Sequence, residues 1–346
     1  MSDPIDIKTK KTLSQTFSQR FDKSLLLDAL ERNIISNWDS WGKLQQSWTN
    51  NAYNTFKDLD KYIVLIYLVR DYWQQLANKF QYFSMSEFYS KETVVIDKIN
   101  LITISTELNI PKETVRRKVN ELQKQGILKR EGKKIVLTRN AYTFQRPEKS
   151  LETLSIFLEK KSKILDVEDW FGEKVSRQEI KAYIEKYFTI IWLRFLKLQI
   201  PFLLRHRKNF RDLESWMVWG NVALHHQKSL ATQHDKLVTI SANQPIDLNN
   251  YYDHVSDLRV ERGVNASSIA DITHIPRATV IRKLKWLVKQ NVLKKNKYLE
   301  YLMSNKGKLN KKIGDTFKIN QVFVAEFIAD FFDYYKNSNF KPDDLQ

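Results

Sequence analysis

The stretch that decides the fold occurs twice, as Ile110-Pro-Lys-Glu-Thr-Val-Arg-Arg-Lys and as Ile275-Pro-Arg-Ala-Thr-Val-Ile-Arg-Lys. At this offset of 165, positions 110–129 match positions 275–294 at 11 of 20 places without a gap. Internal repeats are sought first because they set the number of structural units. We therefore interpret the chain as an internal tandem duplication.

A second, weaker match between two parts of the chain lies before the first one, at an offset of 154 residues. Between 31–60 and 185–214 there are 8 identities in 30 positions, including Trp38 with Trp192 and Lys43-Leu-Gln with Lys197-Leu-Gln. The two offsets differ by 11, which predicts an insertion of about that size in the second copy. The polar segment 241–250 is the candidate.

Each copy has the pattern of two helices joined by a tight turn. Leucine and isoleucine spacing predicts a helix over 102–108 and a second over 111–125, whose apolar positions recur at i, i+4 and i+7. Asn109 tolerates the positive φ that such a turn needs, and Pro111 suits the first turn of the next helix. Gly126 is the expected C-cap. The corresponding residues of the second copy are His274, Pro276 and Asn291.

A predicted β-hairpin follows each pair of helices. Two β-prone runs within 127–138 flank Glu131-Gly132, which is a hairpin signal, whereas the run 292–303 lacks a glycine turn. The order helix, turn, basic helix and hairpin is that of a winged helix-turn-helix.

The stretch 109–128 resembles the helix-turn-helix of bacterial winged-helix transcription regulators, most closely those of the cyclic-AMP-receptor/Fnr type. The likeness covers about 40 residues in each copy. It implies that Lys112, Glu113 and Arg117 read base edges, and that Arg277 and Arg282 do so in the second copy. Ala278 departs from the pattern, so its half-site should differ. No glycine-rich cyclic-nucleotide barrel is apparent, so cyclic-nucleotide control is not implied.

The predicted fold class is mainly α, with two duplicated helical units that each carry a winged helix-turn-helix and a small hairpin wing. Only 8 Gly and 7 Pro in 346 residues favour helices, because turns between strands use these residues. We expect a short amphipathic helix near 151–158 and a last helix over 319–335 that packs on the second copy. The predicted divisions are a polar basic tail (1–24), the first unit (25–140), a helical connector (141–178), the second unit (179–312) and a C-terminal helix with tail (313–346).

The positive charge is concentrated in the two repeats. The chain carries a net charge of +17, and the segments 111–134 and 276–311 hold +6 and +10 of it. Such basic patches are typical of proteins that bind polyanions. Two matched patches of groove size point to double-stranded DNA, since an α-helix fits the major groove.

The candidate DNA contacts form two sets, one for base edges and one for the DNA backbone. The residues expected to reach base edges are Lys112, Glu113, Arg116, Arg117, Asn120, Arg277, Ile281, Arg282 and Lys285. Those expected to contact the DNA backbone are Thr114, Lys129, Arg130, Lys133, Lys134, Thr279, Lys294, Lys295 and Lys297.

Other site types are less favoured by the sequence. There is no cysteine and no phosphate-loop motif, and no nucleophile–base arrangement is recognisable, so we expect no enzymatic activity and no cofactor. His225, His226 and His234 lack suitably spaced acidic partners, so no metal site is expected. The aromatic residues around Trp38, Trp41, Trp48, Tyr53 and Phe56 are interpreted as core, and Asp58, Asp60, Asp212 and Glu214 as carboxylates at helix N-termini. Charged residues and Pro201 interrupt the apolar stretch 188–204, which is interpreted as a buried helix.

The functional hypothesis is a sequence-specific DNA-binding transcription regulator that acts as a pseudo-dimer on two related half-sites. A plasmid-type replication initiator and a winged-helix scaffold for protein partners remain alternatives. We expect a cytoplasmic, nucleoid-associated protein, with RNA polymerase as a possible further partner and no membrane partner. The sequence identifies no small-molecule effector.

Overall fold

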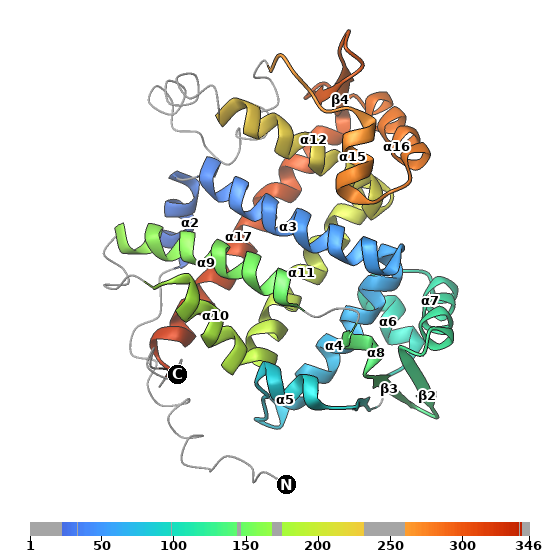
Figure 1. The fold of residues 1–346 in the computed structure, drawn as a ribbon, viewed down its shortest axis with the longest axis vertical. Coiled ribbons are helices and arrows are strands. Elements are labelled where there is room, and N and C mark those ends of the chain that lie inside the picture. The colour runs from blue at the N-terminus through green and yellow to red at the C-terminus, as the bar shows by residue number, and fades with distance from the viewer. Residues whose placement is uncertain are drawn as a thin grey trace.

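The computed structural model describes residues 23–32, 34–97, 99–143, 147–167, 175–231, 260–338 and 340. Helices make up most of these residues, and two small antiparallel sheets lie at one side of the helical body (Figure 1). The predicted mainly helical fold class is therefore confirmed.

The helical body repeats itself in the positions of its helix ends. Helices α2 (Lys23–Arg32) and α3 (Ile34–Phe56) have the same bounds, at the offset of 154, as α10 (Arg177–Lys186) and α11 (Phe188–Phe210). The starts of helices α4 (Leu59–Asn78) and α12 (Leu213–Ala231) correspond at the same offset. The weaker of the two registers seen in the sequence therefore coincides with a repeat of the structure.

Two smaller units carry the stronger repeat. The first unit, residues 93–138, comprises β1 (Thr93–Ile96), α6 (Leu101–Leu108), α7 (Lys112–Lys124), β2 (Leu128–Glu131) and β3 (Lys134–Thr138). The second unit, residues 264–303, comprises α15 (Ala266–Thr273), α16 (Arg277–Lys289), β4 (Leu293–Lys295) and β5 (Tyr301–Met303). At the offset of 165, both helices of the second unit have the same bounds as those of the first. Short helices α5 (Met85–Ser90) and α8 (Asn140–Thr143) flank the first unit.

The turns inside the units use the residues that the sequence singles out. Asn109 and His274 have φ of 48° and 58°, and Gly126 and Asn291 have φ of 67° and 54°. These are left-handed conformations that asparagine and glycine adopt more readily than other residues. The prolines lie one residue earlier than predicted. Pro111 and Pro276 are N-cap residues with extended ψ, because a proline at that point leads the chain into the helix without costing a backbone donor.

Both predicted hairpins form. In the first unit the strand order is β1-β3-β2, with Leu137 paired to Val94 on one side and to Leu128 on the other. Strands β4 and β5 pair in the second unit, and a single bridge joins Val264 to Tyr301.

Reciprocal contacts hold the two halves of the body together. The fully buried amides of Gln45 and Gln199, which are equivalent at the 154 offset, each donate to the other at 2.8 Å. The ring of Trp41 lies 5.4 Å from Phe202, and the equivalent pair, Phe195 and Trp48, lies 5.0 Å apart. Contacts in which position i meets j and j meets i are the signature of an interface around a two-fold axis.

Two connecting helices are longer than predicted. Helix α9 (Glu148–Val167) extends beyond the expected 151–158 at both ends, and α17 (Lys308–Lys336) begins well before the expected start at Ile319. Helix α17 packs on α11 of the second copy, as predicted, and it also contacts the first copy, since Gln321 accepts a hydrogen bond from Asn37 and Phe317 meets Trp38 in an edge contact. The candidate insertion at 241–250 and most of the tail 1–24 lie outside the described residues.

None of the described helices alone is both long and apolar enough to cross a membrane. The pair α10 and α11 reaches that length and composition only when the two are taken together across a bend of 101°.

Candidate nucleic-acid interface

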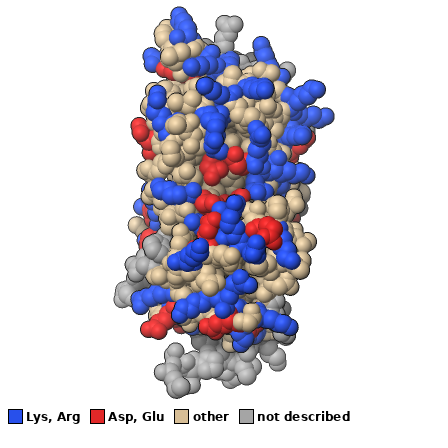
Figure 2. Space-filling model, turned by 90° about the vertical axis from the view of Figure 1, so that its right-hand side faces the viewer, with Lys and Arg blue, Asp and Glu red and all other residues tan. Residues whose placement is uncertain are grey.

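The two units lie on the same side of the molecule, the second above the first at the right of Figure 1. Figure 2 looks directly at that side. Lysine and arginine side chains cover much of its upper part and recur lower down, while acidic side chains gather between. The charge on this side is therefore divided between two patches.

Helices α7 and α16 each bury one face and expose the other. Val115, Val119 and Leu122 are fully buried in α7, as predicted, because they face α4 and the rest of the first unit. The equivalent residues of α16 face α12 in the same way. The opposite face of each helix is therefore free to meet a ligand.

Matched ion pairs seat both helices on the body. The ammonium of Lys118 in α7 lies 2.5 Å from Asp58, and that of Lys283 in α16 lies 2.6 Å from Asp212. Each lysine side chain is only 9% exposed, and each aspartate also accepts from a backbone N–H in the first turn of its helix, Asp58 as the N-cap of α4. The interpretation of these aspartates as helix N-terminal carboxylates is thus confirmed.

These pairs shift the pKa values of their members. Burial alone would lower the pKa of Lys118, but hydrogen bonds to Asp58 and Glu121 hold it above its usual value. Burial would raise the pKa of Asp212, yet its bonds to Lys283 and Ser215 keep it below normal. Lys118 and Lys283 thus serve to dock the two helices on the body, and neither side chain belongs to the exposed faces of α7 and α16.

All but one of the residues predicted to contact bases are exposed. The exception, Ile281, is partly buried at the edge of α16. The exposed ones are Lys112, Glu113, Arg116, Arg117, Asn120, Arg277, Arg282 and Lys285. The backbone-contact candidates divide similarly: Thr114 and Thr279 are partly buried, and Lys129, Arg130, Lys133, Lys134, Lys294, Lys295 and Lys297 are exposed.

Some of these side chains are already engaged with one another. Arg116 forms an ion pair with Glu113 at 2.6 Å, whereas the equivalent positions of α16 hold Ile281 and Ala278. Arg277 donates to Ser267 at 3.0 Å. The first unit thus presents a charged pair where the second presents two apolar groups, so the two helices differ in chemistry at the same place.

Three residues around the second hairpin were not among the predicted contacts. Arg262, which precedes the second unit, forms an ion pair with Glu300 at 2.8 Å, and Tyr298 and Leu299 are exposed at the tip. In place of a glycine, the side chain of Asn296 closes the turn, as asparagine side chains often do.

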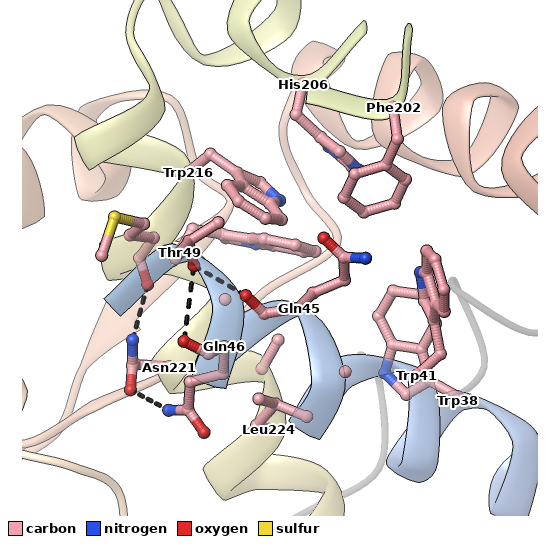
Figure 3. Close-up of a pocket in the computed structure, with 15 residues that line it drawn as sticks. Trp38, Trp41, Gln45, Gln46, Thr49, Phe202, His206, Trp216, Asn221 and Leu224 are labelled. Carbon is pink, nitrogen blue, oxygen red and sulfur yellow. Dashed lines mark hydrogen bonds between the residues drawn. The ribbon is translucent and has the colours of Figure 1, made fainter. Parts of the chain in front are cut away.

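The predicted aromatic core forms, and it surrounds a small cavity (Figure 3). Trp41, Trp48, Tyr53 and Phe56 are buried, and Trp38 is partly buried. The cavity, about 40 Å³, lies between α3, α11 and α12, with Trp38, Trp216 and His206 among its walls. At roughly 10–15 Å³ per water it holds about three water molecules. This small volume indicates a gap in the packing of the aromatic core.

Gly42 and Gly220 line the cavity, and the positions equivalent to them at the 154 offset are Leu196 and Ile66, which are both nearly fully buried. An added Cβ at Gly220 would meet nothing within 4 Å, whereas one at Gly42 would lie 2.5 Å from Leu224. The open space therefore lies beside Gly220, and Leu224 fills the space beside Gly42.

His206 in the cavity wall is held as a neutral ring. Burial and the neighbouring Arg205 lower its pKa to about 3. Arg205 donates to the Asn320 oxygen at 2.7 Å, which turns the Asn320 amide nitrogen toward His206 Nε2 at 3.2 Å. Nε2 is therefore an acceptor, and the ring proton sits on Nδ1.

Metal-binding side chains do not gather in the described part of the chain, where no group of three His, Asp or Glu residues could hold an ion. His234, one of the three histidines considered, lies outside the described residues.

No family model, curated protein or solved structure matches the chain.

Proposed function

We propose that this protein is a sequence-specific DNA-binding transcription regulator that carries two winged helix-turn-helix units in one chain. The observation that carries the proposal is the pair of exposed basic helices, α7 and α16, docked through matched lysine–aspartate pairs on one side of the body. A helix seated in this way presents its outer face as a rigid surface to the major groove.

An internal duplication accounts for the repeated helix ends and for the reciprocal contacts of Gln45 and Gln199. Regulators of this type usually obtain two reading helices by forming a dimer. Here one chain acts as a pseudo-dimer, with the buried pair of glutamines near its approximate two-fold axis.

The two half-sites are related but not identical. Arg117 and Arg282 are equivalent and exposed, so both half-sites share a contact of the kind that arginine makes with guanine. At the neighbouring positions the first unit offers Glu113 and Arg116 and the second offers Ala278 and Ile281. Alanine and isoleucine favour the methyl group of thymine, whereas a carboxylate favours the amino group of cytosine.

Selection of bound sequences from a random DNA pool, at two salt concentrations, tests the proposal. We expect an enriched site with two unequal halves, bound by one chain, and an affinity that falls steeply with salt as counterions are released. Failure to enrich any sequence would refute specific binding. A perfect palindrome bound by two chains would refute the pseudo-dimer.

Charge reversal separates DNA binding from a role in protein contacts. Arg117→Glu combined with Arg282→Glu should reduce the affinity at least about thirtyfold, since each lost guanine contact costs about 1–3 kcal/mol. Lys163→Glu is the matched control, because its side chain is 64% exposed, like Arg117 at 66%, but lies on α9 at the left of Figure 1. Binding to iterated repeats of an origin, in place of one promoter site, would favour the replication initiator.

A further inference from the structure

The tip of the second hairpin exposes two large apolar side chains. Tyr298 is 58% exposed and Leu299 is 65% exposed, at the end of a hairpin that projects from the top of the molecule in Figure 1. Leu299 also has φ of 61°, a left-handed conformation that is unfavourable for a bulky residue. Both features cost the isolated protein stability, and such strain tends to occur at functional sites.

The turn itself is firmly built. The side-chain oxygen of Asn296 accepts from the backbone N–H groups of Tyr298 and Glu300, at 3.0 and 2.9 Å. Glu300 in turn accepts from Arg262, from the backbone of Gly263 and from the Asn296 amide, all at 2.8 to 3.3 Å. The pKa of Glu300 falls to about 2, chiefly because of Arg262. The apolar pair is therefore exposed by a rigid support.

The first hairpin shows that this tip is not a requirement of the fold. The first hairpin is one residue shorter, since Leu128 pairs with Leu137 whereas Leu293 pairs with Met303. At the 165 offset its Gly132, Lys133 and Lys134 take the places of Lys297, Tyr298 and Leu299. In the first unit a glycine takes the positive φ, at 61°, and the exposed residues are lysines. Only the second unit combines an unfavourable backbone with an exposed apolar surface.

Cations surround the apolar tip. Lys294, Lys295 and Lys297 are exposed, and the charged groups of Lys297 and Arg262 lie 5.1 and 5.5 Å from the Tyr298 ring. Glu300, the acidic group that helps to close the turn, is neutralised by Arg262. The partner that fits this tip must therefore be a polyanion that also accepts apolar side chains.

We propose that Tyr298 and Leu299 insert as an apolar wedge between base pairs in the minor groove beside the second half-site. Apolar wedges of this kind unstack one base step and bend the duplex, while flanking cations hold the phosphates. This inference rests on the proposed function, because α16 of the same unit would occupy the adjacent major groove. The first hairpin, with lysines at its tip, follows the backbone without inserting.

The decisive variant gives the second tip the residues of the first, as Tyr298→Lys with Leu299→Lys. If the hairpin only follows the phosphates, two added charges should tighten binding and steepen its salt dependence. If the tip is a wedge, binding should weaken about tenfold despite the added charge. A hairpin that only follows the phosphates and a tip that inserts between base pairs therefore predict opposite changes in affinity.

The direct readout is the fluorescence of 2-aminopurine placed in turn at each step flanking the two half-sites of the selected DNA. We expect the wild-type protein to raise the fluorescence severalfold at one step beside the second half-site, and the double-lysine variant to abolish the rise. Leu299→Gly is the second variant: it removes the apolar side chain but relieves the unfavourable φ, so it should fold at least as well. It should also lose most of the signal.

The outcomes separate this inference from the proposed function. Specific binding with no fluorescence rise at any flanking step, or binding that tightens in the double-lysine variant, would overturn the wedge and leave the DNA-binding proposal standing. An apolar tip that contacts a protein or a membrane would give that result. No specific DNA binding by the wild-type chain would overturn both.

Discussion

Lys161 is a buried lysine whose replacement by an apolar residue should stabilise the protein. It is fully buried on α9, where its ammonium contacts the Ser40 hydroxyl at 3.1 Å and lies 4.9 Å from the Phe157 ring. Burial, with repulsion from Lys160, lowers the pKa to about 7, and the charge of Asp39 offsets this only in part.

The free-energy cost of burying this ammonium follows from its lowered pKa. A fall from 10.5 to about 7 corresponds to about 5 kcal/mol at roughly 1.4 kcal/mol per tenfold change in the proton equilibrium. Because the folded pKa lies below the unfolded one, the unfolded chain binds the proton more tightly between pH 7 and 10.5. Stability therefore falls as the pH is lowered through that window, and the full cost is present below pH 7.

Lys161→Met should remove most of this cost. Methionine fills a similar volume without a charge, and replacing buried ionic groups with apolar ones often stabilises a protein by about 1–4 kcal/mol. The loss of the bonds to Ser40 and Phe157 reduces the gain at both pH values, so we expect about 2–4 kcal/mol at pH 6 and a change within about 1 kcal/mol of zero at pH 9.5, where the charge costs only about 1.4 kcal/mol. Urea unfolding at the two pH values measures both numbers.

The neighbouring Lys160→Met is the control, since Lys160 is only partly buried and should change stability by less than about 0.5 kcal/mol. The reasoning is refuted if Lys161→Met lowers stability at pH 6, or if its effect is the same at both pH values. Either result would mean that the ammonium reaches water in the folded protein.

Two further stability predictions test the docking pairs and the cavity. Asp58→Asn and Asp212→Asn keep a capping side chain but leave a nearly buried lysine with its weaker carboxylate partner, at 3.2 Å in the first unit and 3.8 Å in the second. We expect urea unfolding to show losses of about 1–3 kcal/mol at pH 7, larger for Asp212→Asn. The loss for Asp212→Asn should shrink as the pH falls through the lowered pKa of Asp212, where the carboxylate becomes protonated; a loss that does not depend on pH would contradict the ion-pair account. Gly220→Ala should stabilise α12 by about 1 kcal/mol, because an added Cβ meets nothing within 4 Å. Gly42→Ala should gain less, since its Cβ would lie 2.5 Å from Leu224, so a higher melting temperature for Gly42→Ala than for Gly220→Ala would argue against this view of the cavity.

The elements of the fold could be predicted where a local pattern determines them. Apolar spacing located α6 and α7 to within one residue, and Asn109 and Gly126 marked the turns because few residues adopt a positive φ. The repeat strengthened each assignment, since the same pattern had to hold twice. Helix α17 was underestimated because its first half is polar, and contacts across both copies stabilise it.

The parts of the site that depend on long-range contacts could not be predicted. Lys118 and Lys283 were included in the net charge of the two basic segments, and their docking role could not be seen because their aspartate partners lie 60 and 71 positions away in the chain. The identity of both lysines and both aspartates across the repeats was visible, but pairing them required the packing of α7 on α4. The second tip was missed since its turn depends on Asn296 and Glu300 in place of glycine.

The shared body has a consequence for how the two units could act on DNA. A dimeric regulator loses its second reading helix when it dissociates, so its affinity for a two-part site falls on dilution. Here α7 and α16 are seated on α4 and α12, and the reciprocal bonds of Gln45 and Gln199 fix the halves that carry them. The distance between the reading helices is thereby set within one chain. A duplicated unit can then let its two copies diverge, which a symmetric dimer cannot do. The charged pair of Glu113 and Arg116 in one copy and the apolar tip in the other are divergences of that kind.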